Sequence, residues 1–179
     1  MTQAGRVYGE ALYQLCQEEG LTHQVLSQLR CLQQSFASEP DFIRLLASPS
    51  IPKEERCAIL DQSFRAKIHT YVLNFLKILT EKGYIRHFDD CCKAFIANYN
   101  TDNGILPVTA VTALELTQGQ KQRLMEKLAT VTGKTIELTN QVDPAVLGGM
   151  RLDYDGKRLD DTIAHRLDAI RSLLQNTVL

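Results

Sequence analysis

The period of the apolar residues changes once along this chain, at the polar stretch NYNTDNG, residues 98–104. Before this stretch, apolar side chains recur every three or four residues, which is typical of amphipathic helices. After it, β-branched runs and alternating apolar residues predict strands, and helical periodicity returns only between them. We therefore expect a helical domain, residues 1–103, followed by a small α/β domain, residues 104–179.

Six amphipathic segments precede the change of period and predict an N-terminal six-helix bundle. Gly20 separates the first segment from the second. Pro40 suits the first turn of the third segment, and Pro49 closes it. Pro52 suits the first turn of the fourth, and Gly83 follows the fifth, where glycine commonly ends a helix.

The C-terminal part has the signals of a small α/β domain. Residues 105–114, ILPVTAVTAL, are β-branched and apolar and predict a buried strand. Thr117 and Gln120 have the spacing of a capping box, which predicts the start of a helix. Residues 134–142 and 150–159 alternate and predict further strands. A last helix is predicted from four apolar residues that share one face: Ile163, Leu167, Ile170 and Leu174.

Charge and hydropathy exclude several classes of protein. The chain has 20 Lys and Arg against 21 Asp and Glu, and neither predicted domain is basic, so binding of nucleic acid is not expected. No apolar run is long enough to span a bilayer, and the N-terminus lacks the basic start and apolar core of a signal peptide. We expect no direct insertion into a membrane.

The five cysteines predict neither a disulfide framework nor a metal site. Their number is odd, and no CxxC motif is present. Most of them fall on apolar helix faces, which predicts free, buried thiols in a reducing compartment. The set is Cys16, Cys31, Cys57, Cys91 and Cys92.

Glycines and aspartates crowd into one stretch, VDPAVLGGMRLDYDGKRLDDTI, residues 142–163, where a phosphate loop or metal site could lie. A Walker loop requires Lys and Ser or Thr after its glycines, but Met150 and Arg151 follow the glycine pair. A calcium loop with Gly156 at its sixth position would have Arg151 at its first, and a cation does not bind a cation. Neither motif is present.

Each member of this stretch has a structural explanation instead. Asp155-Gly156 between two alternating segments predicts a type I′ hairpin turn. Asp160 and Asp161 precede a predicted helix, where carboxylates cap free N–H groups. Asp153 alternates with apolar residues and is expected to face solvent. The glycine pair allows a sharp bend into the strand.

The remaining candidates for chemistry are weak. The four histidines have no paired spacing for a metal. His87 and Cys91 are four residues apart on a helix and could form a thiol nucleophile with its base. An enzyme that uses His87 and Cys91, or Asp160 and Asp161, therefore stands as one alternative function, and an unrelated helical adaptor stands as another.

The fifth helical segment, YVLNFLKILTEKG, residues 71–83, is apolar over a wider face than one core contact requires. Such a helix either occupies the centre of a bundle or provides a groove for an amphipathic helix of another chain. The segment alone does not decide between these two positions.

Residues 136–170, IELTNQVDPAVLGGMRLDYDGKRLDDTIAHRLDAI, resemble the C-terminal signature of the δ subunit family of bacterial F-type ATP synthases, whose mitochondrial relative is the oligomycin-sensitivity conferring protein. The opening GRVYGEALYQLC, residues 5–16, resembles the first helix of that family. The order of the helical half and the α/β tail also agrees. The signature positions include Gly148, Gly149, Asp160 and Arg166.

This resemblance implies a stator subunit with no catalytic residues, cofactor or metal. It implies a location in the ATP synthase, peripheral to the cytoplasmic face of the bacterial cell membrane. The C-terminal domain is expected to meet the C-terminal ends of the b subunits. The N-terminal bundle is expected to bind the N-terminal helix of an α subunit in a groove between its first and fifth helices. The expected groove residues are Tyr8, Ala11, Leu12 and Leu15, with Val72, Phe75, Leu76 and Leu79.

Overall fold

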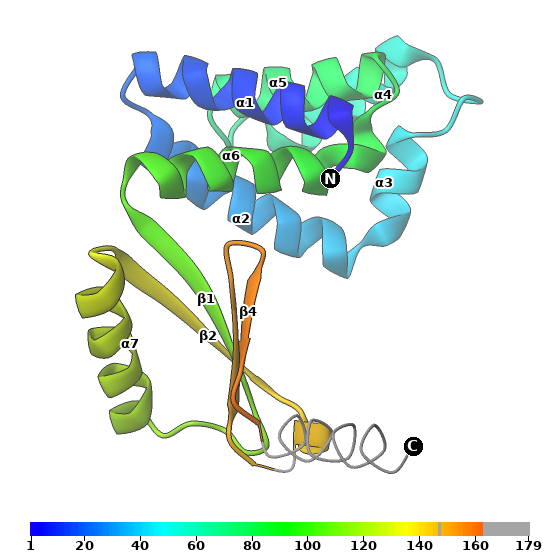
Figure 1. The fold of residues 1–179 in the computed structure, drawn as a ribbon. Coiled ribbons are helices and arrows are strands. Elements are labelled where there is room, and N and C mark those ends of the chain that lie inside the picture. The colour runs from blue at the N-terminus through cyan, green and yellow to red at the C-terminus, as the bar shows by residue number, and fades with distance from the viewer. Residues whose placement is uncertain (147, 163–179) are drawn as a thin grey trace, which may run out of the picture. The chain divides into compact units, whose positions relative to one another are not determined.

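The computed structural model describes residues 1–146 and 148–162 (Figure 1). Over these residues the chain forms seven α-helices and one four-stranded mixed sheet, which confirms an α plus small α/β fold. It divides into two compact units, Met1–Tyr99 and Asn100–Leu179. The division falls inside the sixth helix, slightly before the boundary that the change of period predicts.

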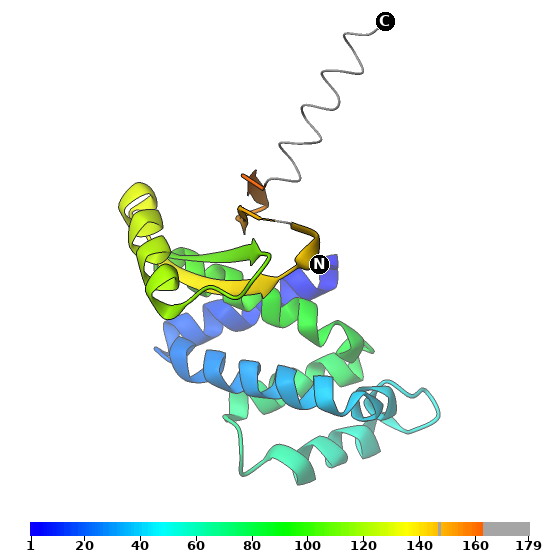
Figure 2. The same cartoon turned by 90° about the horizontal axis from the view of Figure 1, so that it is seen from below.

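The N-terminal unit is built from helices whose ends follow the sequence signals. Gly20 and Gly83 both adopt positive φ, and Pro40 is the first residue of its helix. Pro52 immediately precedes the fourth helix. The helices are α1 (Gln3–Glu18), α2 (Thr22–Ser38), α3 (Pro40–Leu46), α4 (Lys53–Phe64), α5 (Thr70–Glu81) and α6 (Phe88–Asp102), with a 3₁₀ turn, Ile85–His87, before α6 (Figures 1 and 2).

The helix α5 is central to the core of this unit. Val72, Leu76 and Leu79 have no exposed surface, and Phe75 is 6% exposed. They belong to one continuous cluster with buried side chains of α1, α2, α3, α4 and α6. Burial on several sides therefore accounts for the wide apolar face of α5.

Two glycines bring α1 against the backbone of α6. A Cβ atom at Gly5 would lie 2.5 Å from the Cβ of Asp90, and one at Gly9 would overlap the carbonyl oxygen of Cys91 and lie 2.7 Å from the Cβ of Ala94. Real Cβ atoms do not approach other heavy atoms this closely. The contact between these two helices therefore requires residues without a Cβ atom at Gly5 and Gly9.

The N-terminus of α1 is also tied to α6 through polar groups. Thr2 caps α1 by accepting a hydrogen bond from the Gly5 N–H at 3.2 Å, and its own backbone N–H donates to Oδ2 of Asp90 at 2.7 Å. The Thr2 N–H holds the pKa of Asp90 below its ordinary value of 3.8. The Thr2–Asp90 hydrogen bond therefore stabilises the folded chain fully at pH values above 3.8, and this stabilisation is lost as the pH falls through the lowered pKa of Asp90.

The C-terminal unit contains a β-α-β segment followed by a hairpin. The sheet order is β2-β1-β3-β4, in which β1 and β2 are parallel and the other neighbours antiparallel. A capping box between Thr117 and Gln120 opens the helix, as predicted. The elements are β1 (Ile105–Thr112), α7 (Gln118–Thr132), β2 (Thr135–Val142), β3 (Met150–Tyr154) and β4 (Lys157–Asp160), with a 3₁₀ turn, Pro144–Val146, before β3.

The helix α7 packs on one face of this sheet. That face carries Leu106, Val108 and Ala110 of β1, with Ile136 of β2 and Leu152 of β3. The alternation of apolar residues along the strands therefore identifies the core face correctly.

A side chain of β2 joins β1 to the loop before α7. Asn140 donates to the carbonyl oxygen of Ala110 at 3.0 Å and to Oγ1 of Thr112 at 2.9 Å, and its Oδ1 accepts from the Leu116 N–H at 2.7 Å. One amide thereby satisfies three polar groups where the strands end.

The glycine-aspartate stretch has structural roles in the described residues. Asp155 and Gly156 both have positive φ, at 47° and 69°, which agrees with a type I′ hairpin turn. Gly149 has φ 82°, and a Cβ there would overlap the carbonyl oxygen of Asp161. Gly149 thus serves a close approach of two backbone segments as well as a bend. The predicted last helix and Arg166 lie outside the described residues.

We expect Gly9→Ala to destabilise the chain, because the added Cβ must displace the backbone of α6. The overpacking should lower the free energy of unfolding by ~1–3 kcal/mol. Thermal unfolding followed by circular dichroism measures this change. Gly119→Ala is the matched control, since nothing lies within 4 Å of a Cβ there, and alanine should leave the midpoint equal or slightly higher. A Gly9→Ala midpoint at or above that of the unaltered chain would contradict the glycine contact.

We also expect residues 1–103 to fold without the rest of the chain. Their core cluster is built only from residues of α1 to α6 and their connections. A fragment of these residues should have a helical circular dichroism spectrum and one cooperative thermal transition. A fragment that remains unfolded in buffer would refute this independence.

Candidate partner-binding site

The residues that the sequence predicts on α1 lie partly in the core and partly on the surface. Leu12 is 5% exposed and belongs to the core. Tyr8 is half-buried, Ala11 is exposed, and Leu15 is 40% exposed. With Val7, which is also exposed, Ala11 and Leu15 form a row spaced by four residues along one side of the helix.

The residues predicted on α5 are core residues in this structure. Val72, Leu76 and Leu79 are fully buried, and only the edge of Phe75 is accessible. The large apolar side chain that α5 does expose is Ile78, at 43%. Periodicity detects an apolar face but not which part of it neighbouring helices cover, so it does not separate Ile78 from the core residues.

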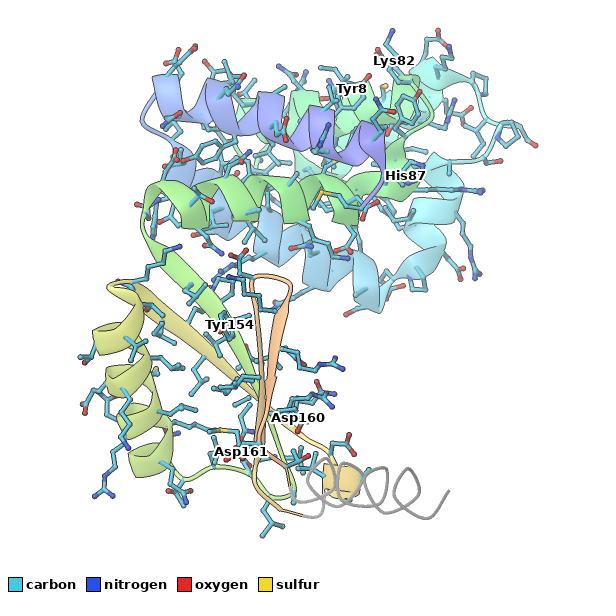
Figure 3. All side chains as sticks on the ribbon, viewed as in Figure 1. Tyr8, Lys82, His87, Tyr154, Asp160 and Asp161 are labelled. Atoms are coloured by element: carbon cyan, nitrogen blue, oxygen red, sulfur yellow. The ribbon has the colours of Figure 1, made fainter. Side chains whose placement is uncertain are left out.

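Aromatic rings extend this exposed apolar surface beyond α1. The rings of Tyr8 and Tyr84 lie 5.8 Å apart between centroids, and Tyr84 lies 6.2 Å from the ring of His87 (Figure 3 labels Tyr8 and His87). Tyr84 follows α5 and is partly exposed. We call the exposed apolar residues of α1 and α5, with this ring pair, the α1–α5 face: Val7, Tyr8, Ala11, Leu15, Ile78 and Tyr84.

Charged side chains next to this face are engaged with one another. Arg6 and Glu10 approach to 3.8 Å along α1, and Lys77 of α5 contacts Asp61 of α4 at 2.7 Å. The face therefore has the chemistry of an apolar docking surface with a polar border, which suits an amphipathic helix.

The thiol candidate lacks the properties of a nucleophile. Cys91 is 1% exposed, and burial raises the pKa of its thiol to about 11. Thiolate is the reactive form, so this cysteine is almost entirely protonated at neutral pH. No hydrogen bond joins Cys91 to His87 in the described part of the chain.

The expectation that most of the five thiols are buried is confirmed. Cys16, Cys91 and Cys92 are buried, and Cys57 is partly exposed. Cys31 is exposed on α2. All five are free thiols.

The aspartates of the C-terminal unit are held by local partners. Asp160 accepts hydrogen bonds from the N–H and Oγ1 of Thr162, at 3.0 and 2.7 Å. Asp153 does not simply face solvent: it lies between Arg151 and Arg158, at 3.3 and 2.8 Å. The hydrogen bond from Arg158 is the main reason that the pKa of Asp153 is lowered.

Within residues 1–146 and 148–162, no three His, Cys, Asp or Glu side chains gather where they could bind a metal ion. Of the helices described, none combines the length and the apolar character that crossing a membrane requires.

Comparison with known proteins places these features in a family. The model of the family "ATP synthase delta (OSCP) subunit" matches residues 4–174. The ATP synthase subunit delta of Alkaliphilus oremlandii is 32% identical over 167 residues, which cover 93% of each chain. The corresponding subunit of Lactobacillus delbrueckii subsp. bulgaricus is 33% identical, with 96% of each chain covered.

A solved structure shares the fold. A chain in the mitochondrial ATP synthase hexamer of Toxoplasma gondii superposes with a TM-score of 0.78 over 98% of both chains, at 21% identity. The family match extends over nearly the whole chain, and the relatives share about a third of their residues with it. The chain therefore belongs to the family of ATP synthase delta (OSCP) subunits, which are structural, non-catalytic subunits of the stator.

Proposed function

We propose that this chain connects the catalytic head of a bacterial F-type ATP synthase to its b-subunit stalk and so resists the torque of the rotor. In this proposal the N-terminal unit acts as a six-helix bundle that binds the N-terminal helix of an α subunit. The C-terminal α/β unit binds the C-terminal ends of the b subunits. The chain then lies on the cytoplasmic face of the cell membrane, peripheral to it.

The observation that carries the N-terminal part of the proposal is the α1–α5 face. Exposed apolar side chains that gather on a monomer commonly mark a partner site, and α1 aligns Val7, Ala11 and Leu15 on the helix that also carries Tyr8 of the ring pair. Burial of the accessible part of each large apolar side chain would contribute about half of the roughly 1.5–3 kcal/mol that burial of a fully exposed one gives, before the cost of association is subtracted. An amphipathic helix with apolar residues at every third or fourth position matches a row spaced by four.

The test separates this face from the core that lies directly beneath it. Phe75→Asp is a poor probe, because Phe75 is 6% exposed and the charge would disrupt folding. Leu15→Asp instead changes an exposed residue. We expect it to weaken binding of a peptide of the α subunit N-terminus by about 2 kcal/mol, or about 30-fold, with the helical fold of the chain retained. Isothermal titration calorimetry and circular dichroism measure both properties on the same variant.

Leu45→Asp is the matched control. Leu45 is a helical leucine of the same unit with almost the same exposure, 39% against 40% for Leu15, but it lies on α3. Its substitution should leave the affinity for the peptide within about twofold, because it lies outside the proposed interface. The proposal for this face fails if Leu15→Asp binds the peptide as tightly as the unaltered chain, or if both variants lose the same affinity.

A further inference from the structure

The apolar side of α7 is itself incompletely buried. Leu124, Met125, Leu128 and Ala129 form its apolar side, and each of them is only partly buried. No residue of α7 is fully buried. A helix that completes a helix–sheet core normally buries some side chains entirely, so this apolar side retains accessible surface.

Exposed cations lie alongside that surface. Arg123, Lys127 and Val131 are spaced by four residues and form one row on α7, and Lys134 follows the end of the helix. Val131 is 84% exposed. In both ribbon views no other described element of this unit lies against the outer side of α7 (Figures 1 and 2).

In the part of the chain that the structure describes, these cations have no counterion, although several others do. Arg6 pairs with Glu10 on α1, Arg44 with Asp41 on α3, and Lys93 with Asp89 on α6. In residues 1–146 and 148–162, by contrast, none of Arg123, Lys127 and Lys134 forms an ion pair.

The acidic residues near the row offset only part of its charge. Glu126 accepts a hydrogen bond from Gln122 at 3.0 Å, and Glu115 pairs with Lys121 at 3.1 Å. Arg123 and Lys127 are like charges four residues apart on a helix, an arrangement that disfavours the helix unless an anion lies nearby.

We propose that the outer side of α7 is the surface that binds the stalk, and that its occupant is an acidic amphipathic helical segment of the b subunit. This inference rests on the proposed function, because it locates the contact of the C-terminal unit. An adjacent helix would place carboxylates against Arg123 and Lys127 and apolar residues against Val131 and the accessible edge of Leu128. A purely polyanionic partner would leave that apolar surface exposed, so nucleic acid and anionic membranes fit less well.

The experiment measures binding of the full chain to the soluble part of the b subunit from the same complex, by calorimetry. The double variant Arg123→Glu/Lys127→Glu should bind at least about tenfold more weakly than the unaltered chain at about 50 mM salt. The affinity of the unaltered chain should be lower at about 300 mM salt than at about 50 mM, because salt screens exposed charges. Val131→Ser should weaken binding several-fold at both salt concentrations. Thermal midpoints should remain unchanged, since all three residues are exposed.

Lys53→Glu/Lys67→Glu is the matched control, because it makes the same change of charge at exposed lysines of the N-terminal unit. Its affinity for the b fragment should equal that of the unaltered chain. Equal losses in both double variants would show a non-specific charge effect and overturn the proposal. Unchanged binding by the α7 variants would also overturn it, while leaving the stalk contact of the C-terminal unit in place.

Two further outcomes distinguish this inference from the proposed function. If the unaltered chain does not bind the b fragment at all, both fail together. If a DNA duplex or anionic phospholipid vesicles bind the unaltered chain more tightly than the b fragment does, and the α7 double variant abolishes that binding, the basic row serves a polyanion and the inference is wrong.

Discussion

The close contact between α1 and α6 determines which side of α1 the chain presents to a partner. Gly5 and Gly9 bring the two backbones together, and the Thr2–Asp90 hydrogen bond fixes the end of α1 in the same place. With the glycine side turned toward α6, the row of Val7, Ala11 and Leu15 lies on the other side of the helix and remains exposed. The glycines at positions 5 and 9 therefore determine which residues of α1 remain accessible on the α1–α5 face.

The sequence predicts the elements of this fold well because their signals are local. The change of period, the capping box at Thr117 and the Asp155-Gly156 turn each depend on neighbouring residues and are confirmed. The sequence does not separate the buried Leu76 from the exposed Ile78, because burial depends on which helices surround α5. It also does not reveal Asn140, whose three partners lie 24 to 30 residues away along the chain.

Several carboxylates and a buried thiol among the described residues have structural roles. Asp90 holds the start of α1, Asp153 lies between two arginines, and Asp160 anchors Thr162. Burial keeps Cys91 protonated. A subunit that joins two partners needs stiff units and two separate docking surfaces. We propose the apolar row on α1 and the basic row on α7 as these surfaces.

We propose that both units are required, because each would hold a different partner. The decisive measurement is ATP-driven proton pumping by ATP synthase membranes depleted of this subunit, with the full chain or residues 1–103 added back. The full chain should restore pumping, whereas residues 1–103 should bind the head but restore none. Full restoration of pumping by residues 1–103 alone would show that the C-terminal unit is not needed.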